Sequence, residues 1–134
     1  MKSLLKSTIF AIAMVSPSLL FAHEGHDHAP GQLVSQNGGV VKSGKEMNLE
    51  MVTEGAKVSF YPLAHTGEKI AVSDVKISAT AQSPKGKPAP LKLESNGSAY
   101  IGIVELAGAV RSTVEVKATY QGKTDIFKFQ VENQ

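Results

Sequence analysis

Three of the four histidines of the chain fall within six residues, in the sequence HEGHDH at positions 23–28. Imidazole and carboxylate groups together bind Cu(II), Zn(II), Ni(II) and Co(II). Spacings of three and two residues allow the three imidazoles to fold round one ion, and the two carboxylates complete the shell or supply a local negative field. This His-rich segment therefore predicts a divalent-metal site. The candidate ligands are His23, Glu24, His26, Asp27 and His28.

The affinity and the metal preference follow from the setting of the His-rich segment. We expect residues 23–37 to be a polar, mobile tail, so that binding costs ordering entropy and gives moderate affinity with little selectivity. A free α-amine on His23 would add a nitrogen and favour Cu(II), although the amino-terminal copper motif, which needs His at the third position, is absent. The alternative is a solvated tail that binds metal only weakly and by accident.

Three further side chains are candidate ligands, each with a structural alternative. His65 lies in the sequence Leu63-Ala64-His65-Thr66-Gly67, which we expect to be a turn, and it is either an exposed turn histidine or a fixed ligand for a metal carried by the tail. Met47 and Met51 alternate on one strand, where thioethers suit Cu(I) but more often fill a core.

The first 22 residues are typical of a secretory signal peptide. Lys2 and Lys6 give a positively charged N-terminal region, and residues 9–15 form an apolar segment. Ala22 offers a small residue for cleavage. The apolar run is shorter than the roughly 20 residues that a membrane span needs, so we expect no membrane insertion after cleavage. An uncleaved N-terminal anchor is the alternative.

The composition after Ala22 excludes several classes of protein. Lys2 and Lys6 lie in the signal sequence and no acidic residue does, so 12 basic and 12 acidic residues remain. The absence of a net positive charge argues against nucleic-acid binding. The chain has no cysteine, which excludes disulfides and thiolate metal sites. No phosphate-binding loop, nucleophile or organic-cofactor motif is recognisable, so we expect no enzyme.

Short alternating apolar runs separated by turn residues predict an all-β domain over residues 38–134. The period-2 pattern and the turn spacing are typical of a small antiparallel, Ig-like β-sandwich of seven or eight strands, with one wet face on each sheet. Asn96-Gly97 is a strong hairpin signal. The expected strands are residues 39–42, 46–53, 57–63, 72–81, 90–95 and 99–106, followed by a hairpin of 113–120 and 124–132.

The sequence Asn37-Gly38-Gly39-Val40-Val41-Lys42, the two strands that follow it, and residues 64–69 resemble a small exported β-domain. That domain is found beside heavy-metal efflux systems of the RND type, and it is similar to a domain of their periplasmic adaptor (membrane-fusion) proteins. The resemblance covers residues 23–80 and implies metal binding or association with efflux in a Gram-negative periplasm. Asn37 stands where the pattern has a His. Copper-resistance C-type proteins offer a second analogy. They share the small β-sandwich architecture and a histidine that corresponds to His23.

The main hypothesis is therefore a periplasmic carrier or buffer that binds a divalent transition metal and is linked to heavy-metal efflux or resistance. Cu and Zn are the first candidates for the metal. Its partners would be the metal ion and an RND efflux adaptor or another periplasmic protein. The rival is a structural or interaction module that docks on an envelope or efflux partner and has an incidental His tail.

The signal-peptide assignment has a direct test. When the full chain is expressed in a Gram-negative host, we expect the exported protein to begin at His23, because cleavage follows Ala22. Intact-mass and N-terminal peptide mass spectrometry of the periplasmic fraction would identify the first residue of the exported protein. A product that retains residues 1–22 in the membrane fraction would establish the uncleaved anchor instead.

Overall fold

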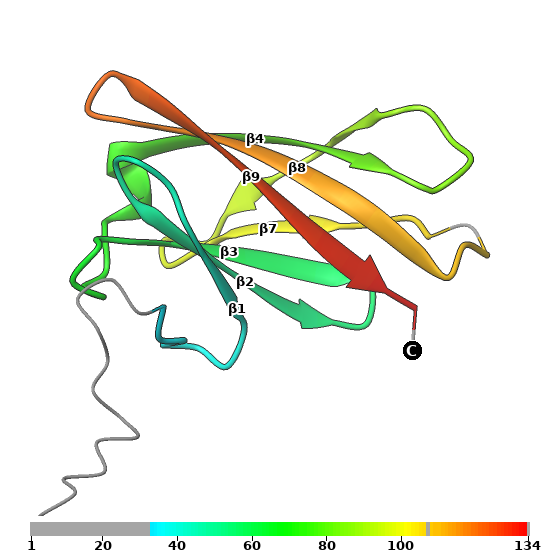
Figure 1. Ribbon diagram of the computed structural model, residues 1–134, viewed down its shortest axis with the longest axis horizontal. Helices are drawn as coiled ribbons and strands as arrows, with labels where there is room; N and C mark the ends of the chain where they lie inside the picture. The colour runs from blue at the N-terminus through cyan, green and yellow to red at the C-terminus, as the bar shows by residue number, and fades with distance from the viewer. Residues whose placement is uncertain (1–32, 107, 134) are drawn as a thin grey trace, which may run out of the picture.

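The computed structural model describes residues 33–106 and 108–133, which form two antiparallel sheets packed face to face (Figure 1). The five-stranded sheet has the order β1 (Val40–Ser43), β2 (Asn48–Glu54), β3 (Lys57–Leu63), β7 (Tyr100–Ile103) and β6 (Glu94–Ser95). The four-stranded sheet has the order β5 (Ala89–Leu91), β4 (Val75–Gln82), β8 (Arg111–Tyr120) and β9 (Lys123–Glu132). The expected antiparallel β-sandwich is confirmed, with nine strands in the described residues.

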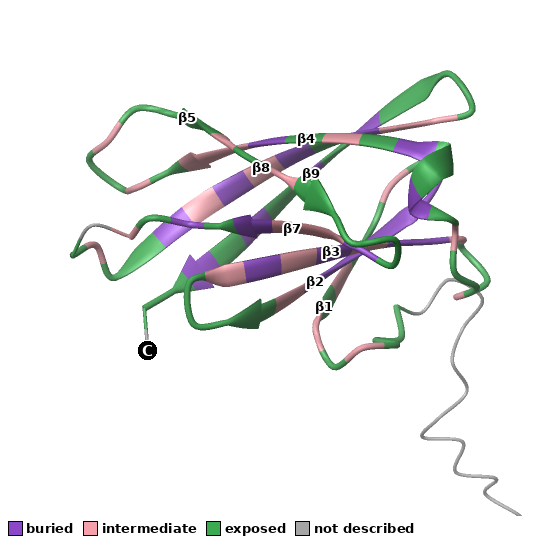
Figure 2. Ribbon diagram, turned by 180° about the vertical axis from the view of Figure 1, so that it is seen from behind, coloured by how far each residue is buried: buried purple, intermediate pink, exposed green. Residues whose placement is uncertain are grey.

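The core lies between the sheets and is built from the alternation in the longest strands (Figure 2). Successive side chains of a strand point to opposite faces, so each strand contributes every second residue to this layer. The buried cluster contains Met47, Leu49 and Met51 from the β2 region, Val58 and Phe60 from β3, Val114, Val116 and Ala118 from β8, and Phe127, Phe129 and Val131 from β9. Met47 and Met51 are thus core residues, and the copper-ligand reading of them is not supported by their burial.

The predicted C-terminal hairpin is confirmed, because β8 and β9 pair along their whole length from Arg111↔Glu132 to Tyr120↔Lys123. Its tip, Gln121-Gly122, has positive φ at both residues, which is the backbone geometry that a tight two-residue hairpin requires. The rings of Phe127 and Phe129 stack on the inner face with centroids 6.5 Å apart.

The expected strand 90–95 is wrong, because the chain changes sheet within it. β5 pairs with β4 in one sheet, whereas Glu94 and Ser95 pair with β7 in the other. The crossing brings Leu93 against Gly102, where an added Cβ would lie 2.8 Å from Leu93 Cδ2 and 3.0 Å from Lys92 O. An alternating pattern of apolar residues does not record which sheet a strand joins, so the division was not visible in the sequence.

Two other strand ends also differ from expectation. Residues 72–74 form a short 3-10 helix, η1 (Val72–Asp74), before β4 begins, and β7 ends at Ile103 rather than at residue 106. The hydroxyl of Tyr100 explains the first change, since it lies 2.6 Å from Val75 O and 3.1 Å from Val72 O and ties the start of β4 to the opposite sheet. In the described part of the chain no helix has the length and apolarity to span a membrane.

The core assignment predicts that two residues of β9 contribute very differently to the free energy of unfolding. Phe129 is 1% exposed and Ile126 is 59% exposed. We expect Phe129→Ala to lower the free energy of unfolding by about 3–5 kcal/mol, because it leaves a cavity between the sheets. Ile126→Ala should change it by less than about 1 kcal/mol. Urea unfolding followed by circular dichroism measures both, and equal losses would contradict the layer described above.

Candidate functional site

The predicted metal ligands divide into two groups. His23, Glu24, His26, Asp27 and His28 lie outside the described residues. His65 lies in the exposed turn after β3. Within residues 33–106 and 108–133, no three His, Asp or Glu side chains are grouped so that they could hold a metal ion. The described domain can therefore contribute His65 to a site but does not complete one by itself.

The ring of His65 is held by one hydrogen bond. Its Nε2 lies 2.9 Å from the carbonyl oxygen of Gly44. A carbonyl oxygen only accepts, so Nε2 carries the proton and the lone pair of a neutral ring is on Nδ1. A backbone carbonyl that binds one ring nitrogen commonly orients a metal-binding histidine. His65 thus has the tautomer and the exposure that a ligand needs.

The Gly44 carbonyl is itself positioned by a buried carboxylate. Asp125 of β9 is 7% exposed and accepts hydrogen bonds from the N–H groups of Lys45 (3.0 Å), Glu46 (2.9 Å) and Met47 (3.2 Å). This Asp125 network ties the loop between β1 and β2 to the opposite sheet. A Cβ on Gly44 would lie 2.5 Å from the carboxylate, so glycine is required there.

A second buried carboxylate, Glu50 of β2, holds the start of the described chain. Glu50 is 0% exposed and lies on the outer face of the five-stranded sheet, opposite the core residues Leu49 and Met51. Donors from four residues surround it: the Ser35 hydroxyl, the backbone N–H groups of Gln36, Asn37 and Gly39, and the Asn37 side-chain amide. We call these residues the Glu50 network.

Hydrogen bonding outweighs burial at Glu50. Burial alone would raise the pKa of this carboxyl, since it removes water from the charge. The bonds from the Ser35 hydroxyl, the Gly39 and Asn37 N–H groups and the Asn37 amide favour the ionised form, and the pKa falls from 4.5 to about 2. The difference corresponds to about 3 kcal/mol. Glu50 is therefore an anionic anchor for residues 35–39.

The Glu50 network brings the N-terminal segment to the turn that carries His65. The side-chain nitrogen of Gln36 is 3.4 Å from the position of a Cβ on Gly67, two residues after His65. Figure 1 shows residues 33–39, in blue and cyan, on the side of β1 and β2 away from the core. Ser35, Gln36 and Asn37, which the sequence assigned to the tail, thus bind the domain directly.

The chain length between the His-rich segment and this contact decides whether the two can meet. Gln36 lies eight positions after His28, and an extended chain spans about 3.3–3.6 Å per residue, or roughly 26–29 Å here. This contour length is the upper limit on how far His28 can lie from Gln36, the residue beside Gly67.

The face beside Glu50 also has an unpartnered oxygen. Asn48 is 6% exposed, pairs with Ser43 and Leu63, and lies on the same outer face as Glu50. Its Oδ1 is buried and has no hydrogen-bond partner among the residues that the structure describes. The outer face of β2 is thus polar and covered at Asn48 and Glu50. The alternation had predicted a solvent-exposed face, and that prediction is wrong for these two residues.

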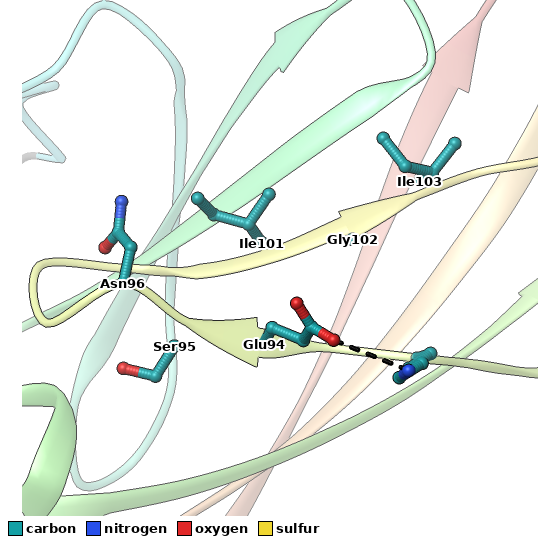
Figure 3. Close-up of a pocket in the computed structure, with 7 residues that line it drawn as sticks. Glu94, Ser95, Asn96, Ile101, Gly102 and Ile103 are labelled. Atoms are coloured by element: carbon teal, nitrogen blue, oxygen red, sulfur yellow. Dashed lines mark ion pairs between the residues drawn. The ribbon is translucent and has the colours of Figure 1, made fainter.

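The sandwich also has a shallow hollow on the outer face of β6 and β7, with a volume of about 440 Å³ (Figure 3). Ile101 and Ile103 line it from β7, and Glu94 and Asn96 line it from the β6 side. The Glu94–Lys92 ion pair at its rim (3.4 Å) is largely exposed, and such pairs contribute little. The lining thus combines the apolar side chains of β7 with the polar side chains of residues 92–96.

Comparisons with known proteins bear on the fold. No model of a protein family matches the chain. No curated protein matches it either. Among solved structures, it is similar to a DUF4426 family protein from Pseudomonas aeruginosa PAO1, with a TM-score of 0.50 and 15% identity over 69% of this chain and 94% of that one. At this identity the likeness supports a shared small β-domain architecture and nothing finer.

Sequence reasoning missed the two buried carboxylates. Glu50 alternates with Leu49 and Met51 and therefore read as a solvent-facing residue. A signal was present nevertheless, in the Ser, Gln, Asn and Gly donors of residues 35–39. Asp125 had no such signal, because its donors lie about 80 positions away in the chain.

The Glu50 network gives a pH-dependent prediction. Glu50→Gln replaces an accepting oxygen by an NH2 group that faces donors, and we expect it to lower the free energy of unfolding at pH 7 by about 2–4 kcal/mol. The native pKa is lowered, so the stabilisation is complete above pH 4.5 and is lost as the pH falls toward 2. The difference in free energy of unfolding between wild type and variant should therefore become smaller as the pH falls from 4.5 toward 2. Urea unfolding at several pH values measures it.

Glu94→Gln is the matched control, because its side chain is 74% exposed in the same sheet. It should change the free energy of unfolding by less than about 0.5 kcal/mol. Hydrogen exchange would also report faster exchange at Asn37 and Gly39 in the Glu50→Gln variant only. A loss at Glu50 that is the same at pH 7 and pH 2 would contradict the role of its charge.

Proposed function

We propose that this protein binds a divalent transition metal in the periplasm, with Cu(II) and Zn(II) as the first candidates, and acts as a carrier or buffer associated with heavy-metal efflux. His23, His26 and His28 supply imidazole ligands, Glu24 and Asp27 support them, and His65 adds a ligand on the domain. The supporting observation is the Glu50 network, which holds residues 35–39 beside the turn of His65.

Chemistry supports this division of labour. Imidazole and carboxylate ligands suit Cu(II) and Zn(II). The exposed His65 has Nδ1 available while its Nε2 is held by Gly44. A ligand fixed on the domain reduces the ordering cost of the remaining ligands, because one end of the chelate is already placed. The arrangement favours capture of an ion and its transfer, since one ligand is fixed on the domain and the others belong to the His-rich segment.

Calorimetric titration of the exported protein with Cu(II) and Zn(II) tests the proposal. We expect one ion per chain, loss of saturable binding when residues 23–28 are deleted, and about tenfold weaker binding in His65→Gln, a change of about 1.4 kcal/mol. The glutamine amide retains a donor for the Gly44 carbonyl. Thr66→Ala is the control on the same exposed turn and should bind as wild type does.

Two results would sink the proposal. One is the absence of saturable binding by the exported protein, and the other is binding that survives deletion of residues 23–28. A wild-type affinity in His65→Gln, with loss on deletion, would confine the site to the His-rich segment and remove His65 from it. Circular dichroism of each variant shows whether the domain remains folded.

A second candidate function is a metal-independent interaction module on an envelope or efflux partner. The observation in its favour is the outer face of β7, where Ile103 is 59% exposed beside the hollow. Capture of an efflux adaptor by the exported protein would distinguish the two. Capture that ignores a chelator and the deletion of residues 23–28, and that is lost in Ile103→Glu, would favour the module.

A further inference from the structure

The outermost strand of the four-stranded sheet is long and regular. β9 is ten residues long and pairs with β8 on one side only, since it ends the strand order of its sheet. The opposite end of that sheet is β5, which has three residues. Long edge strands present a row of backbone donors and acceptors that can accept another strand. β9 is therefore the principal free edge of this sheet.

The hydrogen-bond pattern identifies which backbone groups of β9 are free. Asn133 N–H donates to Val110 O (2.8 Å), one step beyond the pair Arg111↔Glu132. Hydrogen-bonded pairs alternate along an antiparallel ladder, so the odd-numbered residues of β9 bond to β8. The N–H and C=O groups of the even-numbered residues point away from β8, and their side chains are on the exposed face of the sheet.

The two halves of this edge differ in protection. Near the start of β9, Asp125 binds the loop at residues 45–47, and Lys123 lies 3.5 Å from Glu46. An inward-pointing charge and a covering loop are known ways of protecting a sheet edge. Beside the second half, residues 128–132, Lys42 Nζ lies over the inward-facing ring of Phe129, 5.7 Å from its centroid. Among the described residues, no loop hydrogen-bonds to the backbone of residues 128, 130 or 132. An added strand would therefore pair with that half.

The side chains of the second half are self-complementary in one register. Antiparallel pairing of two copies centred on Gln130 places Lys128 of each copy directly opposite Glu132 of the other, and Gln130 opposite itself. Opposite charges facing each other across two strands stabilise the pair. A register centred on residue 128 would set Lys128 against Lys128, and one centred on residue 129 would set Ile126 against Glu132.

We propose that β9 pairs with β9 of a second copy of this chain, in antiparallel register centred on Gln130, to form a two-fold symmetric dimer. The two four-stranded sheets then become one continuous sheet, and the free N–H and C=O groups of residues 128–132 bond to the second copy. The contact involves a short stretch of edge, so the dimer is weak and concentration-dependent. It lies on the sheet that does not carry Glu50 or His65, and it does not depend on the proposed metal site.

Charge exchange tests the register. Analytical ultracentrifugation of the exported protein should show a monomer–dimer equilibrium, with the dimer fraction rising with protein concentration. Lys128→Glu or Glu132→Lys alone sets like charges opposite each other and should weaken dimerisation at least tenfold. The double variant restores opposite charges and should recover the wild-type equilibrium. Because Lys128 also lies 3.9 Å from Glu115 within the chain, recovery in the double variant isolates the contact between copies.

Two controls separate the edge from general effects. Lys117→Glu makes the same change of charge on the exposed face of β8, away from the free edge, and should leave the dimer unchanged. Gln130→Pro removes an N–H that points away from β8, so the monomer should retain its circular dichroism spectrum while the dimer is lost. A monomer at every concentration, or a dimer unaffected by the single charge variants, would overturn the proposal.

Discussion

A carboxylate that is removed from water must be surrounded by hydrogen-bond donors, and in this domain Glu50 and Asp125 obtain them mainly from the backbone of loops. The donors are N–H groups that have no partner within a strand ladder. Each carboxylate therefore orders a segment that has no regular structure of its own. Glu50 binds residues 35–39 to the outer face of the five-stranded sheet, and Asp125 binds the loop after β1 to the four-stranded sheet. The Gly44 carbonyl that binds His65 lies in the loop that Asp125 orders, and Gln36 of the segment that Glu50 orders lies beside Gly67.

The rest of the sandwich is stabilised by apolar packing. No cysteine is present. Each of the three ion pairs among the described residues has a largely exposed lysine, and such pairs contribute little. The two sheets are joined by the rings of Phe60 and Phe129, with centroids 6.0 Å apart, and by the Tyr100 hydroxyl. The polar networks therefore position the loops, whereas the apolar core supplies most of the stability.

The two surfaces with functional interest lie on different sheets. The Glu50 network and the turn of His65 belong to the five-stranded sheet, and the free edge of β9 belongs to the four-stranded sheet. Asp125 of β9 orders the loop whose Gly44 carbonyl binds His65, but it lies outside residues 128–132, the part of the edge that pairs. Metal binding and self-association can thus be measured separately. The DUF4426 family protein shares the architecture but, at 15% identity, gives no information on either surface.

The sequence by itself determined the β-class of the domain, most of its strands, the C-terminal hairpin and the prediction of metal ligands at residues 23–28. These features depend on alternation, turn residues and ligand chemistry, which are local in the chain. Tertiary structure decided that Glu50 is buried, that residues 90–95 divide between the sheets, that Gly44 holds His65 and that β9 is a free edge. Each of these depends on residues far apart in the sequence, such as Glu46 and Asp125, and a local pattern contains no information about which distant segments meet.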